Sequence, residues 1–152
     1  MHFLHKLRSL KPLGRRLLLQ AVVLLPLTTL GLRVFGFNRV YASLARLAGH
    51  KSQARPEDEL KRVRRASHVI RYLARNGLYW GNCLCRSLAL WWLLCRQGIE
   101  CDLRIGVCKN AGRFEAHAWV EHQGRPLNAS RKVHQRFVAF DRPIVPEGVK
   151  FS

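Results

Sequence analysis

Acidic residues are scarce in this sequence. Of its 152 residues only 9 are Asp or Glu, whereas 27 are Lys or Arg, so the formal net charge is +18 with His neutral. This imbalance predicts an acidic partner, whether nucleic acid, anionic lipid or an acidic peptide or protein. Aromatic and basic residues do not interleave as they do on surfaces that bind nucleic acids, so we expect no nucleic-acid partner.

Paired cysteines are also missing. The cysteines are odd in number and confined to one short segment: Cys83, Cys85, Cys95, Cys101 and Cys108. Both features argue against a disulfide framework, and a reducing cytoplasm is the simpler setting. The sequence contains no Cys-x-x-Cys pair, a spacing that structural zinc sites commonly use. We therefore expect no metal and no other cofactor.

A clean membrane-spanning run is lacking as well. Basic residues precede an apolar stretch over residues 17–32, which Pro26 and several polar residues interrupt. The stretch is shorter than the ~20 apolar residues that a spanning helix needs, and no small-residue cleavage site closes it. Three interpretations remain: a helix or helical hairpin docked on the domain, peripheral attachment to a membrane, and a signal or anchor segment.

The pattern predicts two parts in the chain. Residues 1–49 form a basic and apolar N-terminal helical segment, with a break near Gly36 and Asn38. Residues 50–152 form the main domain, which begins with a polar connector.

Two helices are predicted in the main domain. The first begins at Pro56, a residue suited to a first turn, and acidic residues follow it where the helix dipole favours negative charge. An Asn-Gly pair after Arg75 stops it. The second helix covers residues 83–96 and is apolar on most sides, which is typical of a central, buried helix. Within it we expect Arg86 to pair with Glu121 or another buried carboxylate.

Strand patterns follow these helices. Residues 101–108 and 114–122 alternate between apolar and polar side chains, and a turn at 110–112 separates them. A second turn leads into a short strand at 126–128. Helices packed on a small antiparallel sheet make an α+β fold.

Cys83 and His117 are the main candidates for chemistry. Cys83 stands at or next to the start of the buried helix, where unpaired backbone N–H groups favour a thiolate and the oxyanion of a tetrahedral intermediate. His117 lies in mid-strand, and alternation places its ring beside Trp119 and Glu121, on the face opposite Ala118. A helix-start Cys packed against a strand-borne His is the arrangement that papain-like and transglutaminase-like enzymes share.

Local motifs extend this interpretation. They are, in order, Asn-Cys-Leu-Cys-Arg-Ser-Leu-Ala-Leu (82–90), Leu-Leu-Cys-Arg-Gln-Gly-Ile (93–99), Leu-Arg-Ile-Gly-Val (103–107), Ala-His-Ala-Trp-Val-Glu (116–121) and Gly-Arg-Pro-Leu-Asn (124–128). With these motifs the chain resembles the stand-alone transglutaminase-like leader peptidase of lasso-peptide biosynthesis, a microcin-processing protein family. The resemblance covers about residues 60–140.

This resemblance implies a cytoplasmic cysteine protease of transglutaminase-like (papain-like) fold, which removes the leader peptide from a ribosomally synthesised lasso precursor. The family's Cys-Leu-x-Arg motif maps the nucleophile onto Cys83, and its His-Ala-Trp motif maps the base onto His117. Partners are implied too: a separate leader-peptide recognition protein and an asparagine-synthetase-like lactam cyclase. We assign Trp80, Asn82 and Trp119, which are close in sequence to these two positions, to substrate binding.

The sequence departs from the family at one position. Many relatives carry an Asp directly after Gly-x-x-x-Asn, where this chain has Ala129. Asn128 is the nearest candidate to orient His117, by accepting its ring N–H. Alternation on a strand would put residues 128 and 129 on opposite faces, so either the strand has a different register, or the third member is weak or lies elsewhere, with Asp141 as a candidate.

The missing Asp supports a second hypothesis from a different class. The chain would then be a catalytically weak, basic binding module of transglutaminase-like fold that presents the precursor peptide.

Overall fold

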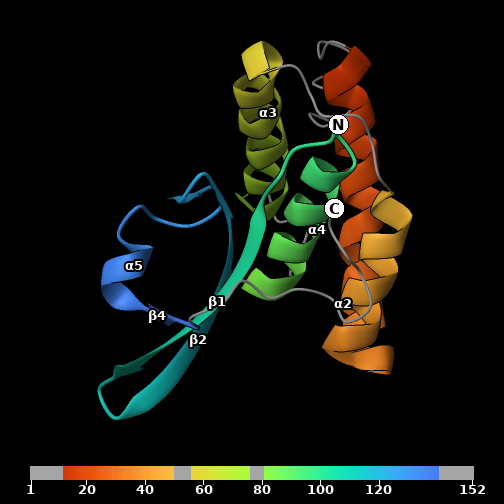
Figure 1. Cartoon of the computed structure of the whole chain (residues 1–152). Helices are drawn as coiled ribbons and strands as arrows, with labels where there is room; N and C mark the ends of the chain where they lie inside the picture. The colour runs from red at the N-terminus through yellow and green to blue at the C-terminus, as the bar shows by residue number, and fades with distance from the viewer. Residues whose placement is uncertain (1–11, 50–55, 76–80, 141–152) are drawn as a thin grey trace.

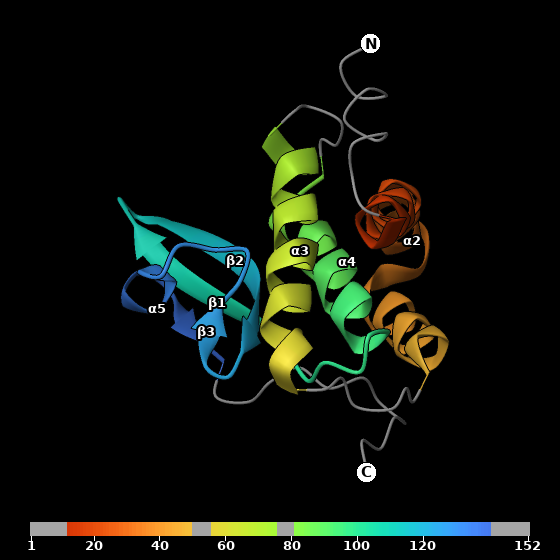
Figure 2. The same ribbon diagram turned by 90° about the horizontal axis from the view of Figure 1, so that it is seen from above.

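The computed structural model describes residues 12–49, 56–75 and 81–140 (Figure 1). The helices are α2 (Pro12–Ala48), α3 (Pro56–Arg75), α4 (Cys83–Cys95) and the short α5 (Val133–Arg136). The strands are β1 (Asp102–Asn110), β2 (Arg113–His122), β3 (Arg125–Pro126) and β4 (Val138–Ala139). Helix α4 is central, with α2 on one side and α3 and the sheet on the other (Figure 2). The described residues form the predicted α+β fold.

Helix α2 is a helical hairpin. Gly36 interrupts it with φ 76° and ψ 174°, a backbone conformation that glycine adopts readily. The two halves pack together closely, since a Cβ added at Gly31 would lie 3.0 Å from Val40 Cγ2. Leu25 and Leu44, one from each half, are buried in the core shared with α4. The predicted break and the docked hairpin are confirmed, whereas the predicted domain boundary stays a prediction.

Helix α4 forms the centre of the core because its sequence is apolar almost all round. Every residue from 87 to 94 is buried, as the pattern predicted. Asn82 caps its start, where the side-chain oxygen accepts a hydrogen bond from Cys85 N–H at 3.0 Å. Helix α3 packs its buried stripe, which includes Ile70 and Leu73, into the same core.

The sheet is antiparallel, in the order β3-β2-β1-β4. Strands β1 and β2 form the predicted hairpin through Ala111 and Gly112, which both have positive φ. Positive φ at both turn residues matches the right-handed twist of the strands. On β2, Val120 is buried among the helices, whereas Trp119 contacts His134 of α5 on the opposite face. The alternation predicted for β2 is confirmed.

Strand β3 is shorter than predicted. It ends at Pro126, and the next three residues form a bend. Leu127 N–H still donates to Val120 O at 2.9 Å. The N–H of Val120, however, donates to the side-chain oxygen Oδ1 of Asn128 and not to a backbone carbonyl. The strand-alternation argument for Asn128 and Ala129 was therefore wrong.

Gly106→Ala should destabilise the fold. In the β1–β2 register Gly106 lies opposite His117, and an added Cβ would lie 2.8 Å from Trp119 Cη2 and 3.0 Å from Val138 O. Either the indole or strand β4 must move, so we expect a loss of about 1–3 kcal/mol in the free energy of unfolding, measured with urea. Lys109→Ala, an exposed site on the same strand, is the near-neutral control. An unchanged unfolding midpoint for Gly106→Ala contradicts this packing.

Candidate active site

Cys83 is the first residue of α4, and its side chain is half-buried. It therefore lies beside the unpaired amides of a helix start. Cys85, by contrast, is buried, and its Sγ accepts a hydrogen bond from Thr29 Oγ1 of α2 at 3.6 Å. The two thiols point to different parts of the molecule, as predicted.

Among the described residues, two backbone amides in the first turn of α4 have no hydrogen-bond acceptor. The N–H of Cys85 donates to the Asn82 side chain, and the N–H of Arg86 donates to the Asn82 carbonyl at 3.3 Å. Within the described ranges, the N–H groups of Cys83 and Leu84 have no such acceptor. Backbone donors beside a nucleophile at a helix start can form an oxyanion hole.

Cys83 and His117 line the same cavity, which lies between α3, α4 and β2. Its volume is about 30 Å³, roughly the space of one water molecule. Asn128, from the bend after β3, and the side chains of Arg71 and Arg86 complete its polar lining. Arg86 stands three residues after Cys83, so both lie on one face of α4. The three residues predicted as catalytic are therefore brought to one place, with two arginines beside them.

His117 lies against two aromatic rings. Its ring is stacked with the ring of Trp119, with centroids 6.1 Å apart and planes at 20°. The centroid of the Phe137 ring lies 5.2 Å from that of His117. Burial lowers the pKa of His117 below the usual 6.5, and the positive charges of Arg86 and Arg136 lower this pKa further. The imidazole is therefore neutral at neutral pH and able to accept a proton.

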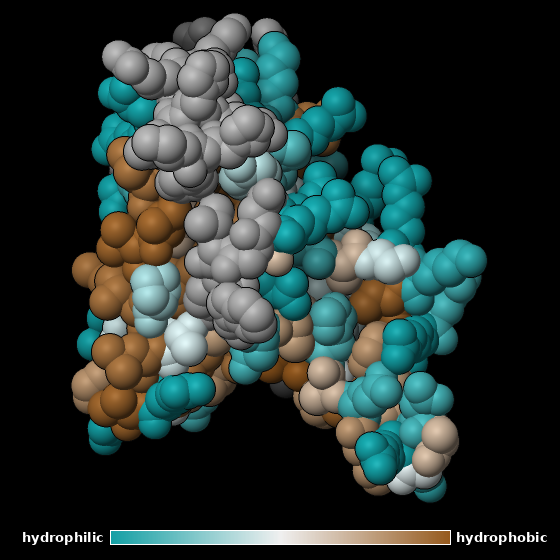
Figure 3. Space-filling view, turned by 180° about the vertical axis from the view of Figure 1, so that it is seen from behind, coloured by the Kyte–Doolittle hydropathy of each residue, from teal (hydrophilic) through white to brown (hydrophobic). Residues whose placement is uncertain are grey.

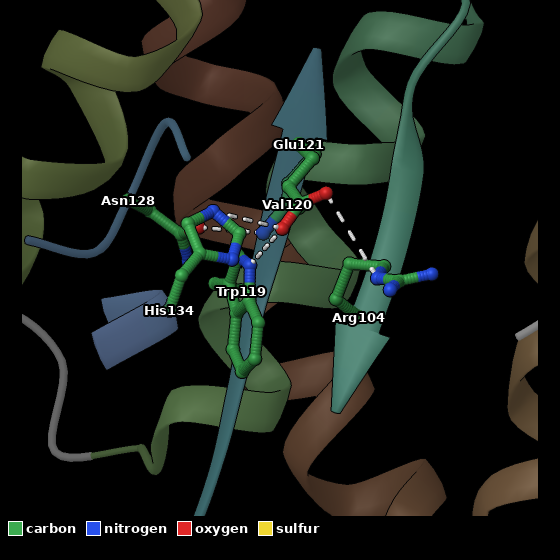
Figure 4. A network of polar contacts seen from close by, with 6 residues as sticks. All are labelled: Arg104, Trp119, Val120, Glu121, Asn128 and His134. Carbon is green, nitrogen blue, oxygen red and sulfur yellow. Dashed lines mark hydrogen bonds and ion pairs between the residues drawn. The ribbon is translucent and has the colours of Figure 1, made fainter. Parts of the chain in front are cut away.

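A polar network holds Trp119, the aromatic neighbour of His117, in place, and Figure 4 shows the network around this indole. The Nε1–H of Trp119 donates to Glu121 Oε1 at 2.6 Å, and His134 Nε2 lies 3.4 Å from the same oxygen. Arg104 Nε lies 3.9 Å from Glu121 Oε2. The expected pairing of Arg86 with Glu121 is wrong, because Glu121 takes its partners from β1, β2 and α5.

Ser87 is the site residue that sequence reasoning missed. Its Oγ–H donates to Ala118 O at 2.9 Å, and its Oγ accepts from Asn128 Nδ2 at 2.8 Å. The available signal was a hydroxyl on a buried, otherwise apolar helix, because buried hydroxyls need partners. Since Asn128 Oδ1 also accepts from Val120 N–H at 2.8 Å, both ends of the amide are engaged. A role for Asn128 in orienting His117 stays a prediction.

The remaining predicted residues have different outcomes. Asn82 is the helix cap, and its contact with a substrate stays a prediction. Trp119 has 0% exposed surface, so we correct its assignment from substrate binding to support of His117. Trp80 and Asp141 lie outside the described residues. In the part of the chain that the structure describes, no cluster of His, Cys, Asp and Glu could hold a metal ion.

A larger hollow also borders His117. Its volume is about 990 Å³, and it is lined by β2, the bend after β3 and α5. Lys132 and Arg136 contribute positive charge to it, and Arg136 pairs with Glu115 at 2.7 Å. Because His117 lines both spaces, it connects the small Cys83 cavity to a surface large enough for a peptide.

The protonation of His117 tests this geometry. In an NMR titration its ring should titrate below 6.5. Arg136→Gln should raise this pKa, because it removes a positive charge that disfavours the imidazolium. Arg131→Gln, which removes an exposed charge outside this group, should leave the pKa unchanged. A His117 pKa at or above 6.5, or a downward shift in Arg136→Gln, contradicts the described surroundings.

Comparison with known proteins bears on the same region. A family model described as the transglutaminase-like superfamily matches residues 23–140, well over half of the 152 residues. No curated protein and no solved structure matches the chain. The matched range includes Cys83, His117 and the strands and helices that position them. The superfamily generally includes cysteine peptidases and transglutaminases. The chain therefore belongs to the transglutaminase-like superfamily.

Proposed function

We propose that this chain is a cysteine peptidase that removes the leader peptide from a ribosomally synthesised lasso-peptide precursor. The observation that carries the peptidase chemistry is one cavity lined by Cys83, at a helix start, and His117, on a strand. The substrate class rests on the resemblance of the motifs at residues 82–90 and 116–121.

The first chemical step is acylation of Cys83. His117 accepts the thiol proton, and the sulfur attacks the carbonyl carbon at the leader–core junction. The N–H groups of Cys83 and Leu84 stabilise the resulting oxyanion. His117 then donates the proton to the departing nitrogen, and the C–N bond breaks. The core peptide leaves with a free amino terminus, and the leader stays on Cys83 as a thioester.

The second step is hydrolysis of this thioester. His117 accepts a proton from water as the water oxygen attacks the thioester carbonyl, and the C–S bond breaks. The imidazolium of His117 returns its proton to the sulfur, which restores the thiol of Cys83, and the leader leaves with a new carboxylate. The lowered pKa of His117 supports the start of both steps, because the imidazole must be neutral to accept a proton from the thiol or from water.

The charges around the site favour an acidic peptide. Arg71 and Arg86 line the Cys83 cavity, and Lys132 lines the larger hollow, where Arg136 is paired with Glu115. Acidic side chains flanking the cut would be attracted to these cations.

Partner proteins belong to the same proposal. The motif resemblance implies a separate leader-recognition protein, which would present the precursor to the Cys83 cavity. An asparagine-synthetase-like lactam cyclase would then use the amino terminus that cleavage releases.

A second candidate is a catalytically weak module that binds the precursor without cutting it. Two observations favour it: Asn128 has both amide ends engaged elsewhere, and the charges acting on His117 are the cations Arg86 and Arg136. A His without an orienting acceptor is a poorer base.

Cleavage of the precursor distinguishes the two candidates. The full chain is mixed with the leader-recognition protein and the precursor encoded beside its gene, and products are followed by mass spectrometry. We expect cleavage at the leader–core junction, and a loss of about a thousandfold or more in rate for Cys83→Ala, because the nucleophile is removed. Cys85→Ala is the matched control and should retain the wild-type rate within severalfold.

Two outcomes would contradict the peptidase proposal. Equal cleavage by Cys83→Ala and wild type excludes Cys83 as nucleophile. Binding of the precursor by the wild type without any cleavage supports the binding module instead.

A further inference from the structure

Among the described residues, one face of α2 is apolar and uncovered. Large apolar side chains with 40–67% of their surface exposed are Leu19, Val22, Val23, Leu27, Leu30, Val34, Phe35 and Leu47. All but the last lie in the first half of the hairpin at helical spacing, so they form one stripe along that half. Figure 3 shows this stripe as a hydrophobic area over α2. We call these eight residues the α2 stripe. Exposed apolar surfaces of this extent mark interaction sites in soluble proteins.

A groove opens along the same face. Its volume is about 930 Å³, and it lies between the two halves of the hairpin. Five residues of the α2 stripe line it together with the indole of α4: Leu19, Val23, Leu27, Phe35, Leu47 and Trp92. The stripe and the groove therefore make one continuous apolar surface.

The charges on α2 all have one sign. Its charged residues are Arg15, Arg16, Arg33, Arg39 and Arg46, and residues 1–49 contain no Asp or Glu. All five arginines are exposed, and two of them, Arg39 and Arg46, line the groove. An apolar face bordered by cations matches a surface of anionic headgroups over acyl chains. Binding of a partner protein helix would not require every charge on α2 to be positive.

The other side of α2 restricts how it could meet a bilayer. The helix is long and apolar enough to cross a membrane. However, Ala21 and Leu25 are buried in the core, and Thr29 bonds to the buried Cys85 of α4. A membrane-spanning position of α2 would remove these contacts from the core, and Gly36 divides the helix. The hairpin is therefore suited to lying in the interface.

From these observations we propose that α2 docks this chain on an anionic lipid surface. The α2 stripe enters the boundary between headgroups and acyl chains, and the five arginines contact the headgroups. The residues that line the Cys83 cavity come from α3, α4, β2 and the bend after β3, and none comes from α2. The sheet and α2 lie on opposite sides of α3 and α4 (Figure 2), so the docked protein keeps its site accessible. This proposal does not depend on the proposed function.

Flotation with lipid vesicles tests the proposal. The full chain is mixed with vesicles of phosphatidylcholine alone or of phosphatidylcholine with phosphatidylglycerol. We expect flotation with the anionic vesicles, weaker at high salt. Leu27→Asp should weaken it about tenfold or more, because a charge enters the apolar boundary. Leu60→Asp, at a similarly exposed leucine on α3, is the matched control and should float like wild type.

The arginines provide an independent arm. Changing both Arg39 and Arg46 to Gln should weaken binding to the anionic vesicles by about 30-fold. Each cation near such a surface strengthens binding about fivefold, and the two effects multiply. The same change at Arg64 and Arg65, which are exposed on α3, should have a smaller effect. Thermal unfolding followed by circular dichroism shows that each variant is folded.

Four results would overturn the proposal. The first is no flotation of the wild type with anionic vesicles at low salt, and the second is equal flotation of Leu27→Asp and wild type. The third is a dimer in light scattering that Leu27→Asp dissociates, which assigns the surface to a second copy of this chain. The fourth is vesicle-bound protein that resists both high salt and alkaline extraction, which indicates a spanning helix.

Discussion

A set of buried and part-buried hydrogen bonds between α4, β2 and the bend after β3 fixes the geometry of the site. Ser87 bonds to Ala118 and Asn128, and Asn128 bonds in turn to Val120. The hydroxyl of Ser87 is fully buried, so an unmade bond would leave this polar atom without water. Cys83 stands one helical turn before Ser87. It is therefore held beside β2, the strand that carries His117.

Both members of the Cys83–His117 pair are held by the rest of the fold. Asn82 fixes the first turn of α4, and the indole of Trp119, anchored by Glu121, supports the ring of His117. A site on regular elements with packed supports keeps its geometry better than a site on loops. The cations around it disfavour a positive imidazolium and favour the negative charges that develop during acyl transfer.

Local patterns in the sequence predicted the elements that carry the chemistry. Residues 83–96 are apolar on most sides of a helix, and this pattern predicted a buried helix that starts at Cys83. Alternation along the strand predicted that His117 lies beside Trp119. The supports were not predictable in this way. They join residues distant in the chain, such as Ser87 with Asn128, and depend on where β3 ends. The partners of Glu121 were missed for the same reason, since no local pattern gives the approach of α5 to β2.

The central claim is that Cys83 and His117 work as a pair, and the reactivity of the thiols tests it without any substrate. The folded chain is treated briefly with iodoacetamide, and modification of each cysteine is followed by mass spectrometry, in wild type and in His117→Ala. The account predicts that Cys83 reacts faster than the other half-buried cysteines, including Cys95 and Cys108, and that His117→Ala slows Cys83 alone, by about tenfold or more. A Cys83 that reacts no faster than Cys95 or Cys108, or at the same rate without His117, would contradict it.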